Sequence, residues 1–296
     1  MRHAAFLAGR LLALLLTALL CGLPVVGAAA AGLRVTAVLD GDTLELEDGR
    51  RVRLAGIEAA KPPRGAKPDD GRVWPLAEAA TAALADLALG RRVAVHGPAA
   101  VDRHGRLLAH LVRDDGLWLQ SALLARGLAR VHSRPDARAY TAELLADEER
   151  ARGAGRGLWR SRVYALRDAG DPDALARDRD SFQVVEGVVL RVSKAGGECY
   201  FDFGEDWRSD VTVHIGRAAQ RAVTAAGIDP LSYEGRRVRV RGWIVLRNGP
   251  MIDITHPEQI ERLERDPLPG PPAVSAPDPD GEDDPLDEDE AEEDPE

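Results

Sequence analysis

Aromatic residues, lysines and cysteines are scarce in this chain. Aromatics make up 4% of the 296 residues, and only three of the 39 basic residues are lysines. The two cysteines, Cys21 and Cys199, exclude a disulfide-rich fold. There is no repeat at solenoid periods, which excludes an array of stacked units. The remaining composition, 45% hydrophobic and 30% charged, is typical of a soluble globular protein with a core.

The first 31 residues have the layout of a secretory signal peptide. Arg2 and Arg10 precede an apolar run at 11–20, and small residues at 27–31 suit a cleavage site. The run is too short to favour a stable membrane span, so we expect an exported protein, periplasmic or secreted. A lipoprotein signal using Cys21 is the alternative, but the bulky Leu20 before it argues against that interpretation. The mature chain would keep Cys199, which we expect to be a small buried apolar residue.

The net charge of −10 is distributed unevenly along the chain. From residue 266 to the C-terminus there are 14 acidic residues and no basic ones, so the rest of the chain carries +4. Prolines and the lack of apolar periodicity predict a disordered acidic tail at 265–296. The tail either covers the arginine clusters or only keeps the protein soluble, and we favour the second interpretation.

The pattern between residues 33 and 160 predicts a strand-rich domain with helices. Alternating apolar and polar residues, broken by Asp-Gly pairs at 40–41 and 48–49, indicate strands joined by tight turns. We expect strands at 33–40, 42–48, 50–57, 91–97 and 106–113. Helical periodicity and flanking Pro or Gly predict helices at 75–89, 118–127 and 136–152. Residues 62–73 are expected to form a mobile loop.

A connector at 161–181 precedes a second predicted domain at 182–264. Strands are expected at 182–193, 198–204, 209–216, 235–249 and 250–254, with one helix at 217–227. This order fits a small five-stranded OB-like barrel. The predicted fold class is therefore mainly β with α, an OB-fold five-stranded barrel with helices followed by a second small OB-like barrel.

Three short motifs carry the residue types that phosphodiester chemistry needs. Asp42 belongs to a turn with two carboxylates, Arg53 and Glu58 flank the exit of one strand, and Arg106 closes a turn that begins at Asp102. Carboxylate and carbonyl oxygens suit a hard cation. Guanidinium groups suit the charge on phosphate oxygens. Each motif is weak alone, but the order and spacing of the three are more specific.

Residues 33–159 resemble the thermonuclease family, whose members are staphylococcal nuclease-like proteins. The matching segments are VLDGDTLEL, VRLAGIEA, DRHGRLLAHL and LLARGLARV, and the ending runs from Glu148 to Trp159. The resemblance covers 127 of the 296 residues. It implies an OB barrel packed by helices and a calcium-dependent nuclease acting on DNA and RNA.

The resemblance also assigns roles to individual positions. Asp42 and Glu58 would bind calcium through carboxylates and Ala59 through its backbone carbonyl, although the family has a shorter aspartate at position 58. Arg53 and Arg106 match the two catalytic arginines. The family's water-activating glutamate falls on Lys61, and a protonated ammonium cannot accept a proton.

Lys61 leaves alternatives open for this site. It could be a base with a lowered pKa, or a third phosphate clamp beside the two arginines. Asp69 or Asp70 in the loop could replace the missing carboxylate. His104 stands where the family has a tyrosine, either as an acid or as a packing substitute.

The second predicted domain offers a separate candidate surface. Single strands commonly bind OB barrels through stacked aromatics and arginines. The candidates for DNA or RNA binding are Tyr200, Trp207, Arg237, Arg239 and Arg241; the three arginines alternate along one strand and share a face. The alternative is an accessory barrel whose charged face is only solvated.

Three functions therefore remain open from the sequence. The first is an exported, metal-dependent phosphodiesterase on nucleic acid, with calcium as the cofactor. The second is a catalytically silent protein that binds nucleic acid or another anion. The third is a structural or protein-interaction module of the cell envelope.

Overall fold

The structure is a computed structural model that describes residues 32–61 and 74–263. The predicted signal peptide, the segment 62–73 with Asp69 and Asp70, and the acidic tail lie outside the described residues. Within the described residues, no helix is both long and apolar enough to cross a membrane.

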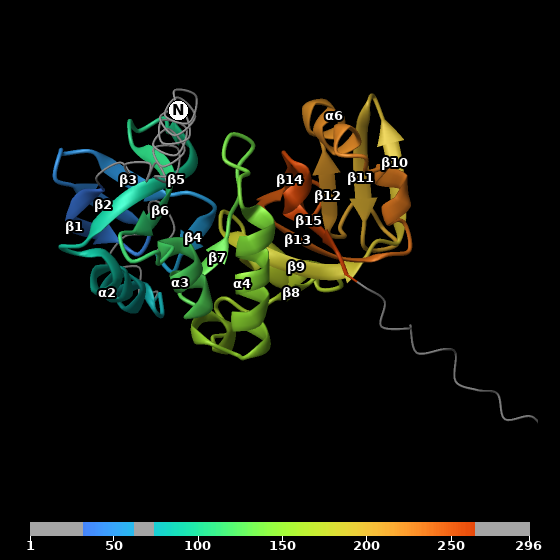
Figure 1. Cartoon of the computed structure of the whole chain (residues 1–296). Helices are drawn as coiled ribbons and strands as arrows, with labels where there is room; N and C mark the ends of the chain where they lie inside the picture. Colours follow the sequence, from blue (N-terminus) through green and yellow to red (C-terminus); the bar gives the residue numbers. More distant parts are fainter. Residues whose placement is uncertain (1–31, 62–73, 264–296) are drawn as a thin grey trace, which may run out of the picture. The chain divides into compact units, whose positions relative to one another are not determined.

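Five strands close into the predicted barrel, which we call the N-terminal barrel (Figure 1). The order around it is β1-β2-β3-β6-β5, with β3 and β6 parallel and the other neighbours antiparallel. This confirms the predicted five-stranded OB-type fold. The strands are β1 (Leu33–Asp40), β2 (Thr43–Leu46), β3 (Arg51–Leu54), β5 (Arg92–Val101) and β6 (Leu107–Arg113).

Helices and a two-stranded ribbon complete the core of this barrel. Fully buried leucines from the barrel, including Leu44 and Leu54, share one hydrophobic cluster with Leu84, Leu123 and Leu144 of the helices. Each such side chain contributes about 1.5–3 kcal/mol by leaving water. The elements are α2 (Ala77–Ala88), α3 (Leu119–Ala125), α4 (Thr141–Gly153), the 3₁₀ helix η1 (Gly157–Arg160), and strands β4 (Ile57–Ala59) and β7 (Ala129–Val131), which pair with each other.

Helix α4 begins at Thr141, five residues later than the sequence predicted. The preceding residue, Tyr140, has a φ of 59° and so cannot belong to the helix. Its ring stacks on His96 at 4.6 Å and meets His110 edge-on at 5.1 Å. Aromatic packing therefore sets this helix start, and the charge pattern of 136–152 does not reveal it.

The second part of the fold is a curled sheet, which we call the C-terminal sheet. Its strand order is β10-β11-β12-β14-β13-β9-β8, and β15 also pairs with β13. Helix α6 (Arg217–Ala225) lies between β12 and β13, as predicted. The strands are β8 (Arg167–Asp168), β9 (Phe182–Val188), β10 (Arg191–Ala195), β11 (Glu198–Asp202), β12 (Thr212–Ile215), β13 (Arg237–Leu246), β14 (Pro250–Ile254) and β15 (Ile260–Arg262).

Two sequence expectations for this region differ from the structure. The predicted strand 182–193 is broken at Val189 and Leu190, so β9 pairs with β13 while β10 pairs with β11. The expected connector also contains β8 and the short helix α5 (Pro172–Arg177). Both elements are too short to show periodicity in the sequence. The described residues all fall within one compact unit.

Candidate functional site

The turn between β1 and β2 buries Asp42. The backbone N–H of Asp42 donates to Oδ1 of Asp40 at 2.9 Å, which fixes the turn. A Cβ on the intervening Gly41 would lie 2.8 Å from the Cβ atoms of both Ala59 and Ala80, so only glycine fits there. As a result the Asp42 side chain is fully buried, and the N–H of Ala59 donates to its Oδ2 at 2.8 Å.

The exit of β3 places Arg53 and Glu58 side by side. Gly56, with a φ of 77°, turns the chain from β3 into β4. Arg53 then reaches two carboxylates: Nη1 lies 2.9 Å from Asp42 Oδ2, and Nη2 lies 2.7 Å from Glu58 Oε2. The predicted arginine and the two predicted metal carboxylates therefore do meet, as ion pairs with one another.

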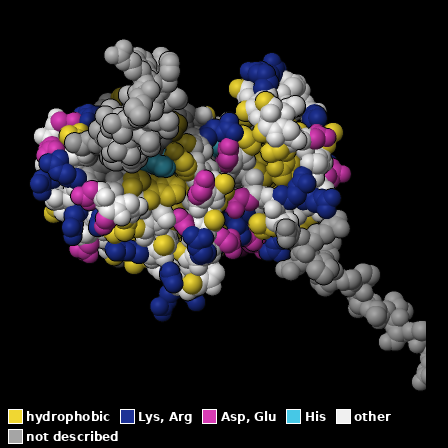
Figure 2. Space-filling model, in the orientation of Figure 1, with side chains coloured by type: hydrophobic (Ala, Val, Ile, Leu, Met, Phe, Trp, Pro, Cys, Tyr) yellow, Lys and Arg dark blue, Asp and Glu magenta, His cyan; other side chains and the backbone are white. Residues whose placement is uncertain are grey.

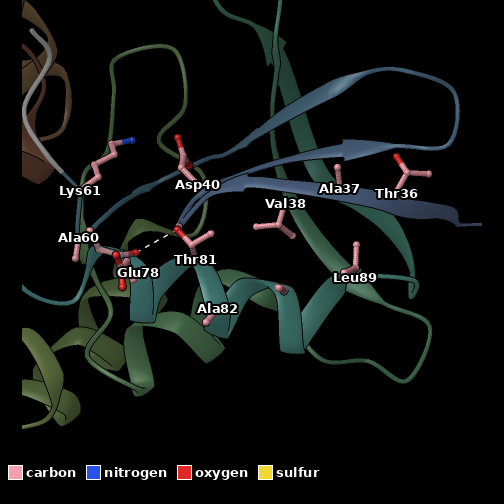
Figure 3. A pocket seen from close by; sticks show the side chains of 13 residues that line it. Thr36, Ala37, Val38, Asp40, Ala60, Lys61, Glu78, Thr81, Ala82 and Leu89 are labelled. Carbon is pink, nitrogen blue, oxygen red and sulfur yellow. Dashed lines mark hydrogen bonds between the residues drawn. The ribbon is translucent and has the colours of Figure 1, made fainter. Parts of the chain in front are cut away.

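Lys61 completes this cluster from the end of the β4 segment. Its Nζ lies 2.9 Å from Asp42 Oδ1, 3.0 Å from Asp42 Oδ2 and 3.4 Å from Glu58 Oε1. Figure 3 shows that Lys61 and Asp40 project toward each other at one end of a groove between β1 and α2. The ammonium group is therefore inserted among the carboxylates.

The electrostatics of the cluster follow from burial and from its two cations. Burial alone would raise the pKa of Glu58, but a hydrogen bond from His132 and the charges of Arg53 and Lys61 hold it well below its usual range. Burial raises the pKa of Asp42, and the charges of Arg53 and Lys61 act against that effect. A carboxylate held as anionic as Glu58 is a poor proton acceptor.

This arrangement does not fit the expected calcium ion. The Lys61 ammonium lies between the carboxylates of Asp42 and Glu58, where a shared cation would have to sit. Asp40 is the third carboxylate of the cluster, so Arg53 and Lys61 leave it a net charge of only −1, which attracts a divalent ion weakly. The N–H of Ala59, whose carbonyl is the predicted metal ligand, donates to Asp42 and so ties this residue to the cluster. Among the described residues, no group of three or more acidic, His or Cys side chains is arranged to hold a metal.

Arg106 is held by a turn after β5. Oδ1 of Asp102 accepts from the N–H groups of His104 and Arg106, and Oδ2 lies 2.8 Å from Arg106 Nη2. Partial burial opposes ionisation of Asp102, but the hydrogen bonds from Arg106 and His104 lower its pKa to about 2. His104 is exposed at the turn, with Nε2 3.3 Å from Arg103 Nε.

Arg53, Glu58, Lys61 and Arg106 line one cavity of about 670 Å³. This volume is within the roughly 300–1,000 Å³ of ordinary ligand pockets. Six Arg or Lys side chains and four carboxylates line it, so the cavity carries a positive excess. By contrast, cationic and acidic side chains are interspersed over the surface seen in Figure 2.

Strand β7 and the residues after it add three groups that the sequence analysis missed. Arg130, His132 and Arg134 line the same cavity. His132 Nδ1 lies 3.3 Å from Glu58 Oε2, and burial lowers the pKa of Arg130 to about 10. Their spacing of two residues was the available signal, because alternate residues of a strand share a face.

Two of the predicted nucleic-acid-binding arginines are buried against the N-terminal barrel. Arg241 is 1% exposed, and its Nη1 lies 2.8 Å from Glu148 of α4. Arg239 is also buried, between Glu186 and Glu149. The prediction of an exposed arginine face is therefore wrong for these two, because acidic side chains cover that face. Arg237 is exposed and pairs with Glu186 at 3.3 Å.

The other predicted binding residues of the C-terminal sheet lie outside the 670 Å³ cavity. Tyr200 donates to Glu198 at 2.9 Å and stacks on His214 at 4.9 Å. Trp207 is 45% exposed, with the Arg208 guanidinium 4.6 Å from its ring centroid. Cys199 is a free, buried thiol, as the sequence analysis expected.

Comparison with known proteins identifies the class of this barrel. The family model for staphylococcal nuclease homologues matches residues 51–161. Two proteins, from Escherichia coli O157:H7 and Escherichia coli, are each described as an uncharacterized endonuclease. Each is 34% identical over 131 residues, which cover 43% of this chain and 75% of the relative. The chain therefore belongs to the staphylococcal nuclease homologue family, as the sequence motifs predicted.

Proposed function

We propose that this protein binds nucleic-acid phosphodiesters in the 670 Å³ cavity and cleaves them. The observation that carries the proposal is that Arg53, Lys61 and Arg106 line one cavity together with Glu58 and His132. Family membership and the endonuclease description of the Escherichia coli relatives support a nuclease-like activity and nucleic acid as the ligand.

Arg106 is the principal phosphate-binding residue in this proposal. Its side chain is 22% exposed and, among the described residues, pairs with one carboxylate, Asp102, so its remaining N–H groups can donate to a phosphate. Arg53 is 11% exposed and already contacts Asp42 and Glu58. Arg53 therefore attracts the phosphate of the bound substrate less strongly than Arg106 does. Its proposed role is to stabilise the negative charge that develops on the phosphate oxygens during the reaction.

In this proposal His132 activates the attacking water in the cavity that it lines. Its Nδ1 faces Glu58, which leaves Nε2 as the acceptor. Water oxygen would bond to phosphorus while His132 Nε2 takes the water proton. The phosphorus bond to the leaving oxygen would then break, and that oxygen would take a proton from solvent. Glu58 orients the ring through its contact with Nδ1, as carboxylates do beside catalytic histidines.

Binding without cleavage is the second candidate function. Lys61 favours it, because the ammonium occupies the position where the family has a glutamate that handles the attacking water. In that case Lys61 and Arg106 would act as phosphate clamps alone.

A gel assay on single-stranded DNA, RNA and plasmid DNA, combined with oligonucleotide binding, separates these functions. The parent should bind and cleave. Arg106→Ala should weaken binding and lose cleavage, whereas His132→Gln should bind like the parent but cleave about 100-fold more slowly or worse. Binding by the parent without cleavage supports the second candidate. If the parent neither binds nor cleaves these substrates, both candidate functions are refuted, and a structural module is the interpretation that is left.

Export to the periplasm or medium is also part of the proposal, and it rests on the signal-like pattern of residues 1–31. Fractionation of cells that express the full chain tests it, and retention of the intact chain in the cytoplasm would refute it.

A further inference from the structure

The C-terminal sheet supplies one wall of the phosphate-binding cavity. Phe182 and Gln183 of β9 and Trp243 of β13 line the cavity that also contains Arg53 and Arg106. The wall thus combines aromatic and amide groups with the cations of the N-terminal barrel. Aromatic rings beside cationic side chains are the usual composition of sites that bind single-stranded nucleic acid.

Trp243 is unusually exposed for its place in the sheet. It is 39% exposed, whereas its neighbours Gly242 and Ile244 in β13 are buried. A large aromatic side chain that stays in contact with solvent at a cavity wall leaves apolar area for a ligand to cover.

Phe182, Arg130 and Tyr164 form a chain of aromatic and cation–π contacts next to Trp243. Phe182 meets the Trp243 ring edge-on at 6.3 Å, and the Arg130 guanidinium lies 5.1 Å from the Phe182 ring centroid. Tyr164 lies on that guanidinium too, at 5.3 Å. Arg130 Nη2 also donates to the Phe182 carbonyl at 2.8 Å. These contacts restrict the residues behind Trp243, so the wall is preorganised for binding.

Three buried polar atoms of the cavity residues have no hydrogen-bond partner among the described residues. They are Nε1 of Trp74, Nη1 of Arg130 and Oε1 of Gln183, a side chain that is 5% exposed. Buried polar atoms are nearly always paired in native proteins, so unpaired ones indicate a place for a polar ligand or water.

We infer that the cavity is a nucleotide site whose base stacks on Trp243 while the adjacent phosphate binds Arg106. The C-terminal sheet then supplies affinity for single strands, and its contribution comes from this wall and not from the buried arginines. The inference depends on the proposed phosphate site and adds the base-binding part to it.

The test compares binding of a fluorescent single-stranded oligonucleotide to full-chain variants. Trp243→Ala should weaken binding about 5- to 150-fold, the range that base–aromatic stacking gives. Trp243→Phe should recover most of that loss, because the ring is retained. Trp207→Ala is the matched control, since it removes another exposed tryptophan, in the turn between β11 and β12, that lies outside the cavity.

An abasic oligonucleotide of the same length distinguishes stacking from a change of fold. It should bind the parent and Trp243→Ala equally, because it has no base to stack. If Trp243→Ala binds the ordinary oligonucleotide as tightly as the parent does, or weakens both probes alike, the base site is refuted. Arg106→Ala separates this outcome from failure of the proposed function: if that variant also binds like the parent, the phosphate site itself is wrong.

Discussion

Replacing Lys61 by glutamate, the residue that the family has at this position, tests whether the lysine prevents calcium binding at this site. In the parent, the Lys61 ammonium lies 2.9 Å from the fully buried Asp42 and 3.4 Å from Glu58. Lys61→Glu removes this cation and adds a carboxylate. The variant should therefore be unstable without metal and should gain a calcium site that the parent lacks.

The size of the effect can be worked out from the burial of the pair. Removing one partner of a buried ion pair costs about 3–5 kcal/mol. Arg53 still pairs with Asp42, and Lys61 is 25% exposed, so we expect the lower end, about 3 kcal/mol. For a unit of this size that corresponds to roughly 6–12 °C in Tm. Calcium at 100 times its Kd should restore about 2.7 kcal/mol.

Thermal unfolding in EDTA, calcium and magnesium measures both effects. The parent's Tm should be the same in EDTA and in calcium, while the Tm of Lys61→Glu should rise by several degrees with calcium. Lys61→Met is the matched control: it also loses the ion pair, but it adds no carboxylate and should not respond. We also expect Lys61→Glu to cleave plasmid DNA faster than the parent when calcium is present.

Two results would refute this reasoning. One is a parent Tm that rises with calcium as much as the variant's, which would mean that the ion binds despite the ammonium. The other is a Lys61→Glu protein that ignores calcium, which would mean that the carboxylates do not converge.

Three further predictions follow from individual contacts. Arg106→Ala should lower the slope of log binding constant against log salt concentration for single strands by about 0.7, which is the loss of one phosphate contact. Arg208→Ala should leave the slope unchanged, because Arg208 is exposed and lies outside the cavity. Arg241→Met leaves Glu148 buried without its closest cation, so urea unfolding should show a loss of about 3–5 kcal/mol; a loss below 1 kcal/mol would contradict this. Burial lowers the pKa of His110 and of His256 to about 4 from 6.5, so the unfolded chain binds more protons between these values. The stability that these histidines contribute should therefore be fully present above pH 6.5 and fall by roughly 3 kcal/mol per histidine as the pH drops to about 4. Urea unfolding at several pH values measures this, and His256→Gln should flatten the profile.

The sequence predicted the N-terminal barrel well because its signals are local. Alternation of apolar residues and Asp-Gly turns define strands, and the motif spacing located Asp42, Arg53 and Arg106 at one rim. Residues 128–134 also carried a usable signal, since Arg130, His132 and Arg134 alternate along β7 and beyond. That signal is weak, because β7 is only three residues long and its alternation does not stand out in the sequence.

The face of β13 that carries Arg239 and Arg241 could not be interpreted from the sequence of that strand alone. Alternating arginines look the same whether water, nucleic acid or an acidic helix covers them. Here Glu148 and Glu149 of α4 cover Arg241 and Arg239, and these residues are about 90 positions away in the chain. Only the packing of the two elements distinguishes a binding face from an interface.

The charge of the cluster around Asp42 links the loss of the calcium site to the loss of the usual water-activating group. With a glutamate at position 61, Asp42, Glu58 and that glutamate would carry three negative charges against the single positive charge of Arg53. With lysine, the same four positions are neutral, and the adjacent Asp40 leaves the cluster with a single negative charge. One residue therefore weakens the attraction for a divalent cation and removes the proton acceptor together. We therefore expect cleavage by the parent to use a base outside this cluster, and among the described residues we propose His132, which lines the cavity and faces Glu58.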